Sequence, residues 1–113
     1  MILFLKNWMP ESRRMKNKKG VTVKPYRFTR QFEESLAAQP DEIIDLFEKK
    51  LEIFLTNIFH PSFRTKKIKG LKKPIIWEAS LTMNYRFTFQ IEENDKIIFR
   101  NIGKHSILNK KKF

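Results

Sequence analysis

The sequence predicts an α+β protein in which two helices cover one face of a mainly antiparallel sheet. Apolar residues recur every three or four positions between residues 29 and 55, which is the period of a helix. From residue 64 onward the apolar residues alternate with polar ones, which is the period of a strand. At 113 residues and 13.7 kDa the chain has room for one modest core, so we expect one folded domain.

Residues 1–20 are predicted to be a basic N-terminal extension, and residues 21–113 the folded domain. The apolar start, MILFLKNWMP, is much shorter than the ~20 residues of a transmembrane helix. It has no basic segment before it and no small-residue cleavage site after it, and the charged stretch that follows lacks periodicity and closes on Gly20. We therefore expect no signal sequence and no membrane anchor, and Met15 is an alternative start.

The domain begins with a strand and a helical hairpin. The segment VKPYRF favours a strand at a sheet edge, since Pro25 near its start has no N–H to donate. Thr29 is a candidate N-cap for a first helix, and Pro40 stands at the start of a second. The apolar stripes of the two helices consist of Phe32, Leu36 and Ala37 in the first and Ile43, Ile44, Phe47, Leu51, Phe54 and Leu55 in the second.

The segments IIWEASL and YRFTFQI are predicted to pair as an antiparallel hairpin through a loop at residues 82–84. Pairing Leu81 with Tyr85 brings every apolar residue of the alternation to one face, because facing residues of an antiparallel pair share a side. The segment KIIFRNI then returns as the next strand, and RTKKIKG precedes the hairpin, which makes about four strands. The predicted inner face of the hairpin consists of Ile75, Trp77, Ala79, Leu81, Tyr85, Phe87, Phe89 and Ile91.

The last strand is less regular. Pairing Ile91 with Ile97 sends Phe99 to the apolar face and leaves Ile98 and Ile102 facing water or a partner. We expect this strand to stop at Gly103, because glycine permits backbone angles that let the following Lys and His fold over the sheet edge.

The face of the sheet away from the helices is predicted to be open, polar and cationic. If Ile68 points inward, Lys67 and Lys69 point outward beside this face, and His105 lies at its rim. Arginines bind phosphate through paired hydrogen bonds, and histidine moves protons near neutral pH, so such a face suits a phosphodiester. Its predicted members are Glu78, Ser80, Arg86, Thr88 and Arg100.

The charge indicates a polyanionic partner. The chain carries 24 Lys and Arg against 12 Asp and Glu, a net charge of +12. Nucleic acid, an anionic membrane surface and an acidic protein all fit this balance. The absence of cysteine excludes a disulfide framework and fits a reducing compartment such as the cytoplasm. With two histidines far apart in the sequence, we expect no metal site and no cofactor.

The segments HPSFRTKKIKG, IWEASLTMNYRFTFQI and IIFRNIGKH, following a strand and two helices, resemble the RelE/ParE superfamily of toxins from bacterial type II toxin-antitoxin modules. The likeness covers about residues 23–108 and is closest to the YafQ-like and RelE-like branch. It implies a RelE-like fold and an mRNA interferase, an endoribonuclease that cuts messenger RNA, usually on the ribosome. Cleavage would use the ribose 2′-hydroxyl without a metal, and a cognate acidic antitoxin would be the partner. Nothing in the sequence predicts an oligomeric state.

The resemblance also implies roles for individual residues. Arg86 matches the arginine that steadies the phosphate, and His105 matches the position that protonates the leaving 5′-oxygen. A relative with a carboxylate base has its acid where this chain has Lys66, so the general base is open. His60 or a lysine could replace it, or geometry and charge alone could suffice. The expected RNA contacts are Lys66, Lys67, Lys69, Arg100 and Lys104.

Structural roles compete with these assignments. His105 could be an ordinary surface histidine, and Arg86 could pair with Glu78 or Glu92 on a solvated face. Trp77 suits the core better than a base-stacking platform, and His60 at a helix end suits a cap. We keep Glu78, Trp77 and His60 as supporting candidates.

Two other classes of function stay open. One is a ParE-like inhibitor of DNA gyrase without chemistry of its own, which would need no proton donor at the Gly-Lys-His segment. The other is a non-catalytic RNA-binding protein, which would be expected to display paired aromatic side chains for base stacking.

Overall fold

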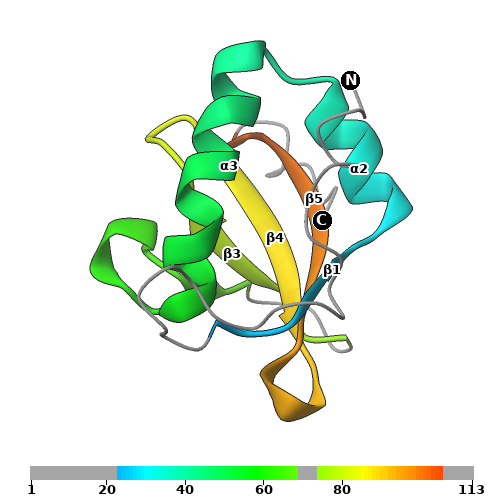
Figure 1. Cartoon of the computed structure of the whole chain (residues 1–113), viewed down its shortest axis with the longest axis vertical. Helices are drawn as coiled ribbons and strands as arrows, with labels where there is room; N and C mark the ends of the chain where they lie inside the picture. The colour runs from blue at the N-terminus through cyan, green and yellow to red at the C-terminus, as the bar shows by residue number, and fades with distance from the viewer. Residues whose placement is uncertain (1–22, 69–73, 106–113) are drawn as a thin grey trace.

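The computed structural model describes residues 23–68 and 74–105, which form a five-stranded sheet with two α-helices on one face (Figure 1). The elements follow the order β1 (Tyr26–Phe28), α2 (Arg30–Ala37), α3 (Asp41–Thr56), the 3₁₀ turn η1 (Pro61–Phe63), β2 (Lys66–Lys67), β3 (Trp77–Ser80), β4 (Tyr85–Ile91), the 3₁₀ turn η2 (Glu93–Asp95) and β5 (Ile97–Lys104). The predicted α+β class is confirmed. The predicted extension at residues 1–20 lies outside the described residues.

The strand order across the sheet is β1-β5-β4-β3-β2. Strand β1 runs parallel to β5 at one edge, and the other neighbouring strands are antiparallel. The first strand is therefore at an edge, as predicted, and the sheet has five strands rather than about four. In Figure 1, α3 crosses in front of β3 and β4, while α2 lies beside β5.

Local signals start the two helices where the sequence predicts. The Thr29 hydroxyl accepts a hydrogen bond from the Phe32 N–H at 3.1 Å, and it donates to the Phe99 carbonyl of β5 at 2.9 Å. Helix α3 begins directly after Pro40. None of the helices in the described ranges has the length and apolar character to cross a membrane.

The core between helices and sheet is aromatic. Phe54 of α3 packs edge to face against Phe87 and Phe89 of β4, with ring centroids 5.0 and 5.1 Å apart. Such pairs contribute about 0.5–1.5 kcal/mol beyond the burial of their area. Both predicted helical stripes point into this core, except that Ala37 is only half-buried. The helical side of the sheet is thus closely packed against α2 and α3.

The hairpin register is the predicted one. The Leu81 N–H donates to the Tyr85 carbonyl at 2.8 Å, and Trp77 faces Phe89 across β3 and β4. The prediction that Ile75 belongs to the inner face is wrong, because β3 begins only at Trp77 and the Ile75 residue is 50% exposed.

A β-bulge in the pairing of β4 with β5 changes the second half of the register. Ile91 faces Ile97 and Phe89 faces Phe99 as predicted, but Thr88 then faces Asn101, so Arg100 is the extra residue.

Beyond the bulge, alternation along β5 is reversed. Ile102 faces Phe87 and is buried in the core, which corrects the prediction that it faces water. Ile98 precedes the bulge and lies on the other face, yet it too is buried. The strand continues through Gly103 to Lys104, so the prediction that it stops at Gly103 is also wrong.

Candidate functional site

Polar side chains gather on the face of the sheet opposite the helices. Cross-strand pairing places Glu78 opposite Thr88 and Ser80 opposite Arg86. Arg100, in the bulge, donates a hydrogen bond to Gln90 on the same face. The polar cluster, as we name this group, consists of Glu78, Ser80, Arg86, Thr88, Arg100 and His105. The sequence predicted these residues for this face and its rim.

The centre of the polar cluster is less open than predicted. Thr88 is fully buried, and Glu78 and Ser80 are 8% and 7% exposed. Thr88 lies in the central strand, opposite Glu78 of β3 and Asn101 of β5.

Glu78 is in contact with both residues that the sequence singled out for chemistry. Its Oε2 lies 3.8 Å from Nη1 of Arg86 and 3.6 Å from Nδ1 of His105. The Glu78 and Arg86 side chains are largely buried, whereas that of His105 is 41% exposed. The structural role that the sequence offered for Arg86, an ion pair with Glu78, therefore exists. This pair is buried rather than solvated.

Several hydrogen-bonding groups of the polar cluster have no partner among the described residues. They are Ser80 Oγ, Thr88 Oγ1, Arg86 Nε and Arg100 Nε. A buried polar group without a hydrogen bond costs about 1–3 kcal/mol, and native proteins contain few of them. All four groups can donate, so this side of the sheet holds several donors whose hydrogen bonds are not made within the described residues.

The backbone holds His105 at the end of β5. Its N–H donates to the Asn84 carbonyl at 2.8 Å, and Asn84 belongs to the loop between β3 and β4. The Thr82 hydroxyl tightens that loop by accepting from the N–H groups of Asn84 and Tyr85 at 3.1 and 3.0 Å. His105 is thereby tied to the hairpin that carries Glu78 and Arg86.

Gly103 leaves space in front of Arg86, which it faces across β4 and β5. A Cβ built on Gly103 would meet no described atom within 4 Å, and its φ is outside the left-handed region. The predicted reason for this glycine, an unusual backbone angle, is therefore wrong. The lack of a side chain keeps room on the Arg86 side of the sheet.

The two lysines of β2 point to opposite faces. Lys66 faces Glu78, on the side of the polar cluster, whereas Lys67 faces Trp77 on the helical side. The prediction that Lys67 flanks the cationic face is thus wrong. Lys66 and not Lys67 faces Glu78, so the alternation along β2 is the reverse of the one expected from an inward Ile68. Lys69 lies outside the described residues.

The remaining cationic candidate is Lys104. It faces Tyr85 across the sheet, on the opposite side from Arg86 and Gly103. Of the predicted RNA contacts, Arg100 is therefore part of the polar cluster, and Lys66 lies beside it on the same face.

His60 and Trp77 have local structural partners. His60 caps η1, where its Nδ1 accepts from the Ser62 N–H at 3.2 Å. Trp77 is half-buried and packs edge to face against the exposed Phe59, with centroids 5.5 Å apart. Neither residue is brought into the polar cluster.

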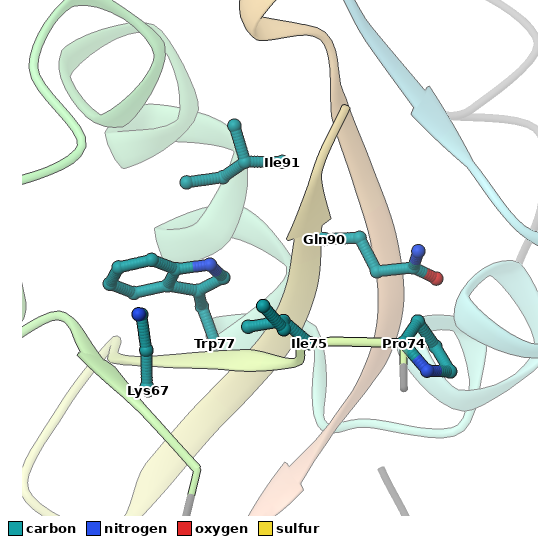
Figure 2. Close-up of a pocket in the computed structure, with 6 residues that line it drawn as sticks. All are labelled: Lys67, Pro74, Ile75, Trp77, Gln90 and Ile91. Atoms are coloured by element: carbon teal, nitrogen blue, oxygen red, sulfur yellow. The ribbon is translucent and has the colours of Figure 1, made fainter. Parts of the chain in front are cut away.

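A cavity of about 420 Å³ lies beside Trp77. Figure 2 shows the Lys67 amine next to the indole ring, and its nitrogen lies 5.5 Å from the ring centroid. The cavity shares no residue with the polar cluster, and its lining is mostly apolar, consisting of Lys67, Pro74, Ile75, Trp77, Gln90 and Ile91. Within the described ranges, no three His, Cys, Asp or Glu side chains come together as metal ligands.

No protein-family model matches the chain, and no curated protein matches it significantly. Solved structures match it in fold. The RelE–RelB complex from the archaeon Pyrococcus horikoshii gives a TM-score of 0.60 at 15% identity, covering 74% of this chain and 96% of that chain. The Escherichia coli DinJ–YafQ toxin-antitoxin complex gives 0.55 at 11% identity, with 76% and 97% covered. The RelB–RelE antitoxin-toxin complex from Methanococcus jannaschii gives 0.53 at 20% identity, with 74% and 95% covered.

Proposed function

Since the chain has the RelE-like toxin fold, we propose that it is the toxin of a type II toxin-antitoxin module. We propose further that it is a metal-independent endoribonuclease that cuts messenger RNA, on the ribosome in the cytoplasm, by attack of a 2′-hydroxyl on the adjacent phosphate. The observation that supports this most directly is the polar cluster, in which Arg86 and His105 both contact Glu78 on a face with unpartnered donors.

Arg86 is the proposed ligand of the scissile phosphate. Its Nη1 is directed to Glu78 and its Nε has no partner in the described part of the chain. Negative charge builds up on the phosphate oxygens as the 2′-oxygen attacks, and an oriented donor at that place is worth about 10²–10³-fold in rate. The buried guanidinium provides such a donor without having to reorganise.

His105 is the proposed general acid. Its ring is the most exposed of the three, so a substrate bound at the polar cluster can reach it. Because Nδ1 faces Glu78, the proton for the leaving 5′-oxygen would come from Nε2. A group in this role contributes about 10²–10⁴-fold.

Lys66 and Arg100 are the proposed ligands of the phosphates next to the scissile one, since both lie on the face that carries Arg86. Lys67 and Lys104 point to the other face, so we assign them no contact next to the scissile phosphate. The net charge of +12 provides long-range attraction for RNA in addition.

An acidic antitoxin is the proposed partner. The similar RelE and YafQ structures are complexes with RelB and DinJ. For this chain, a segment rich in Asp and Glu that covers the polar cluster would neutralise the toxin by excluding RNA.

Cleavage by the purified full chain tests the proposal. Messenger RNA is incubated with the protein, once free and once bound to ribosomes, and the ends of the fragments are mapped. We expect cuts in the ribosome-bound messenger that Arg86→Ala and His105→Ala abolish. The opposite result would be growth arrest in both variants while the messenger stays intact even with the wild-type protein. That result would contradict the ribonuclease proposal and favour an inhibitor of DNA gyrase.

A further inference from the structure

We propose that Glu78 is the general base of the reaction, the group that removes the proton from the attacking 2′-hydroxyl. This inference rests on the proposed ribonuclease function. It assigns the one proton transfer for which the sequence and the resemblance leave the residue open.

The sheet holds Glu78 in a defined place. It lies between Lys66 on β2 and Thr88 on β4, with a paired neighbour on either side. The next residue, Ala79, is fully buried in the core, so a rotation of the strand that moved Glu78 would also take Ala79 out of the core. A group on a paired strand is positioned more accurately than one on a loop, which is what a general base requires.

The carboxylate of Glu78 is buried without close partners. Its two contacts, at 3.6 and 3.8 Å, both involve Oε2 and both exceed the 2.7–3.2 Å range of ordinary hydrogen bonds. No described residue donates a hydrogen bond to this carboxylate. Burying a carboxylate in this way lowers stability, and such groups are found where a ligand completes the hydrogen bonding. A ribose hydroxyl donating to Oε1 would do so.

The geometry differs from that of a structural ion pair. An arginine and a carboxylate that stabilise a fold commonly form two parallel hydrogen bonds at about 2.7–2.9 Å. Arg86 Nη1 and Glu78 Oε2 instead lie 3.8 Å apart, beyond hydrogen-bond distance. Arg86 therefore keeps donors for a phosphate, and Glu78 keeps an oxygen for a hydroxyl.

The other candidates for the base are placed less well. His60 is exposed at η1, where its Nδ1 is used by Ser62. Lys66 faces Glu78, but it is exposed on the two-residue edge strand β2. Glu78 is the carboxylate that the strand pairing brings to Arg86 and His105.

The proposed step balances in protons and bonds. Glu78 Oε1 takes the proton of the 2′-hydroxyl while the 2′-oxygen forms its bond to phosphorus. The bond from phosphorus to the 5′-oxygen breaks, and that oxygen receives a proton from His105 Nε2. The products are a 2′,3′-cyclic phosphate and a 5′-hydroxyl, after which Glu78 loses its proton to water and His105 regains one from water.

A substrate with a better leaving group separates the base from the acid. The cut site is first mapped with wild-type protein on ribosome-bound and free RNA. The same RNA is then made with sulfur in place of the bridging 5′-oxygen at that site, because a thiolate leaves without a proton. Glu78→Gln should slow cleavage of both substrates by about 10²–10⁴-fold. His105→Ala should be slow on the natural RNA and close to wild type on the sulfur substrate.

The controls distinguish a structural role from a chemical one. Glu52→Gln makes the same change on the exposed side of α3 and should leave both rates unchanged. If Glu78→Gln unfolds, Glu78→Asp, which keeps the charge and shortens the side chain, replaces it and should still cut both substrates more slowly than wild type.

The remaining outcomes test the base assignment of Glu78 separately from the ribonuclease function. A Glu78 variant that folds and cuts natural RNA within about threefold of wild type overturns the base assignment, while the ribonuclease function stands. Rescue of the Glu78 variant by sulfur would also overturn it, since Glu78 would then act only through His105. If wild-type protein cuts neither ribosome-bound nor free RNA, the proposed function itself fails.

Discussion

The carboxylate of Glu78 lies 3.6 Å from the imidazole Nδ1 of His105. This contact joins the middle of β3 to the residue that follows β5, and Arg86 of β4 approaches the same carboxylate oxygen. A carboxylate of β3, a guanidinium of β4 and the imidazole that follows β5 thus meet on the face that the helices leave uncovered.

Removing Arg86 or His105 should abolish toxicity without unfolding the protein. Neither side chain belongs to the aromatic core. Arg86→Ala should reduce the cleavage rate about 10²–10³-fold and His105→Ala about 10²–10⁴-fold. If both groups act on one phosphate, as proposed, the double variant should lose less than the product of the two single losses. Single-turnover cleavage and growth of expressing cells measure the effect, and full multiplication of the two losses would contradict a shared phosphate.

The adjacent lysines of β2 provide a matched pair for RNA binding. Both are exposed, but Lys66 lies on the side of the polar cluster and Lys67 on the side of Trp77. Lys66→Ala should weaken RNA binding and reduce the slope of log K against log salt by about 0.7, the value for one phosphate contact on a single strand. Lys67→Ala should leave the slope unchanged. Equal effects in a salt titration would show that binding reflects net charge rather than this face.

Enlarging Gly103 should block the site while keeping the fold. A Cβ has space there and the backbone angle suits any residue, so Gly103→Ala should retain most activity. Gly103→Val directs two methyl groups toward Arg86, its partner across β4, and should reduce cleavage at least tenfold with an unchanged melting temperature. Circular dichroism on heating monitors the fold. Full activity of the valine variant would mean that the phosphate does not lie in front of Arg86.

The proposed acidic antitoxin should associate rapidly at low salt and more slowly as salt rises, because charge attraction accelerates encounter. Hydrogen exchange of the complex should show protection on β3, β4 and the end of β5. Stopped-flow mixing at several salt concentrations measures the rates. A partner that protects only α2 and α3, and leaves Arg86 and His105 accessible, would contradict the proposed neutralisation.

The aromatic core should dominate stability. Phe54 is buried among Phe87, Phe89 and Phe99, so Phe54→Ala should lower the free energy of unfolding by about 3–5 kcal/mol. The preceding residue, Ile53, is 52% exposed, and Ile53→Ala should cost much less. Urea unfolding of both variants gives the comparison, and similar losses would place the core elsewhere.

The face of the sheet on which Arg86 and Glu78 lie was predicted better than the contacts that they make. Alternation along β4 was sufficient to place Arg86 away from the core, and Glu78 followed from its partner across the hairpin. No spacing in the sequence indicates that His105 contacts Glu78, because that contact depends on where β5 ends and on the loop carbonyl of Asn84.

The sequence by itself determined the fold class, the starts of both helices and the hairpin register through Leu81 and Tyr85. These features depend on local periodicity and capping, which a short window of residues contains. Only the tertiary structure decided that Ile102 is buried, that Lys66 rather than Lys67 lies on the side of the polar cluster, and that Glu78 contacts both Arg86 and His105. The physical reason is that one extra residue in a strand reverses every side chain beyond it. Whether a bulge is accepted depends on packing between distant segments, here the burial of Ile102 against the helices.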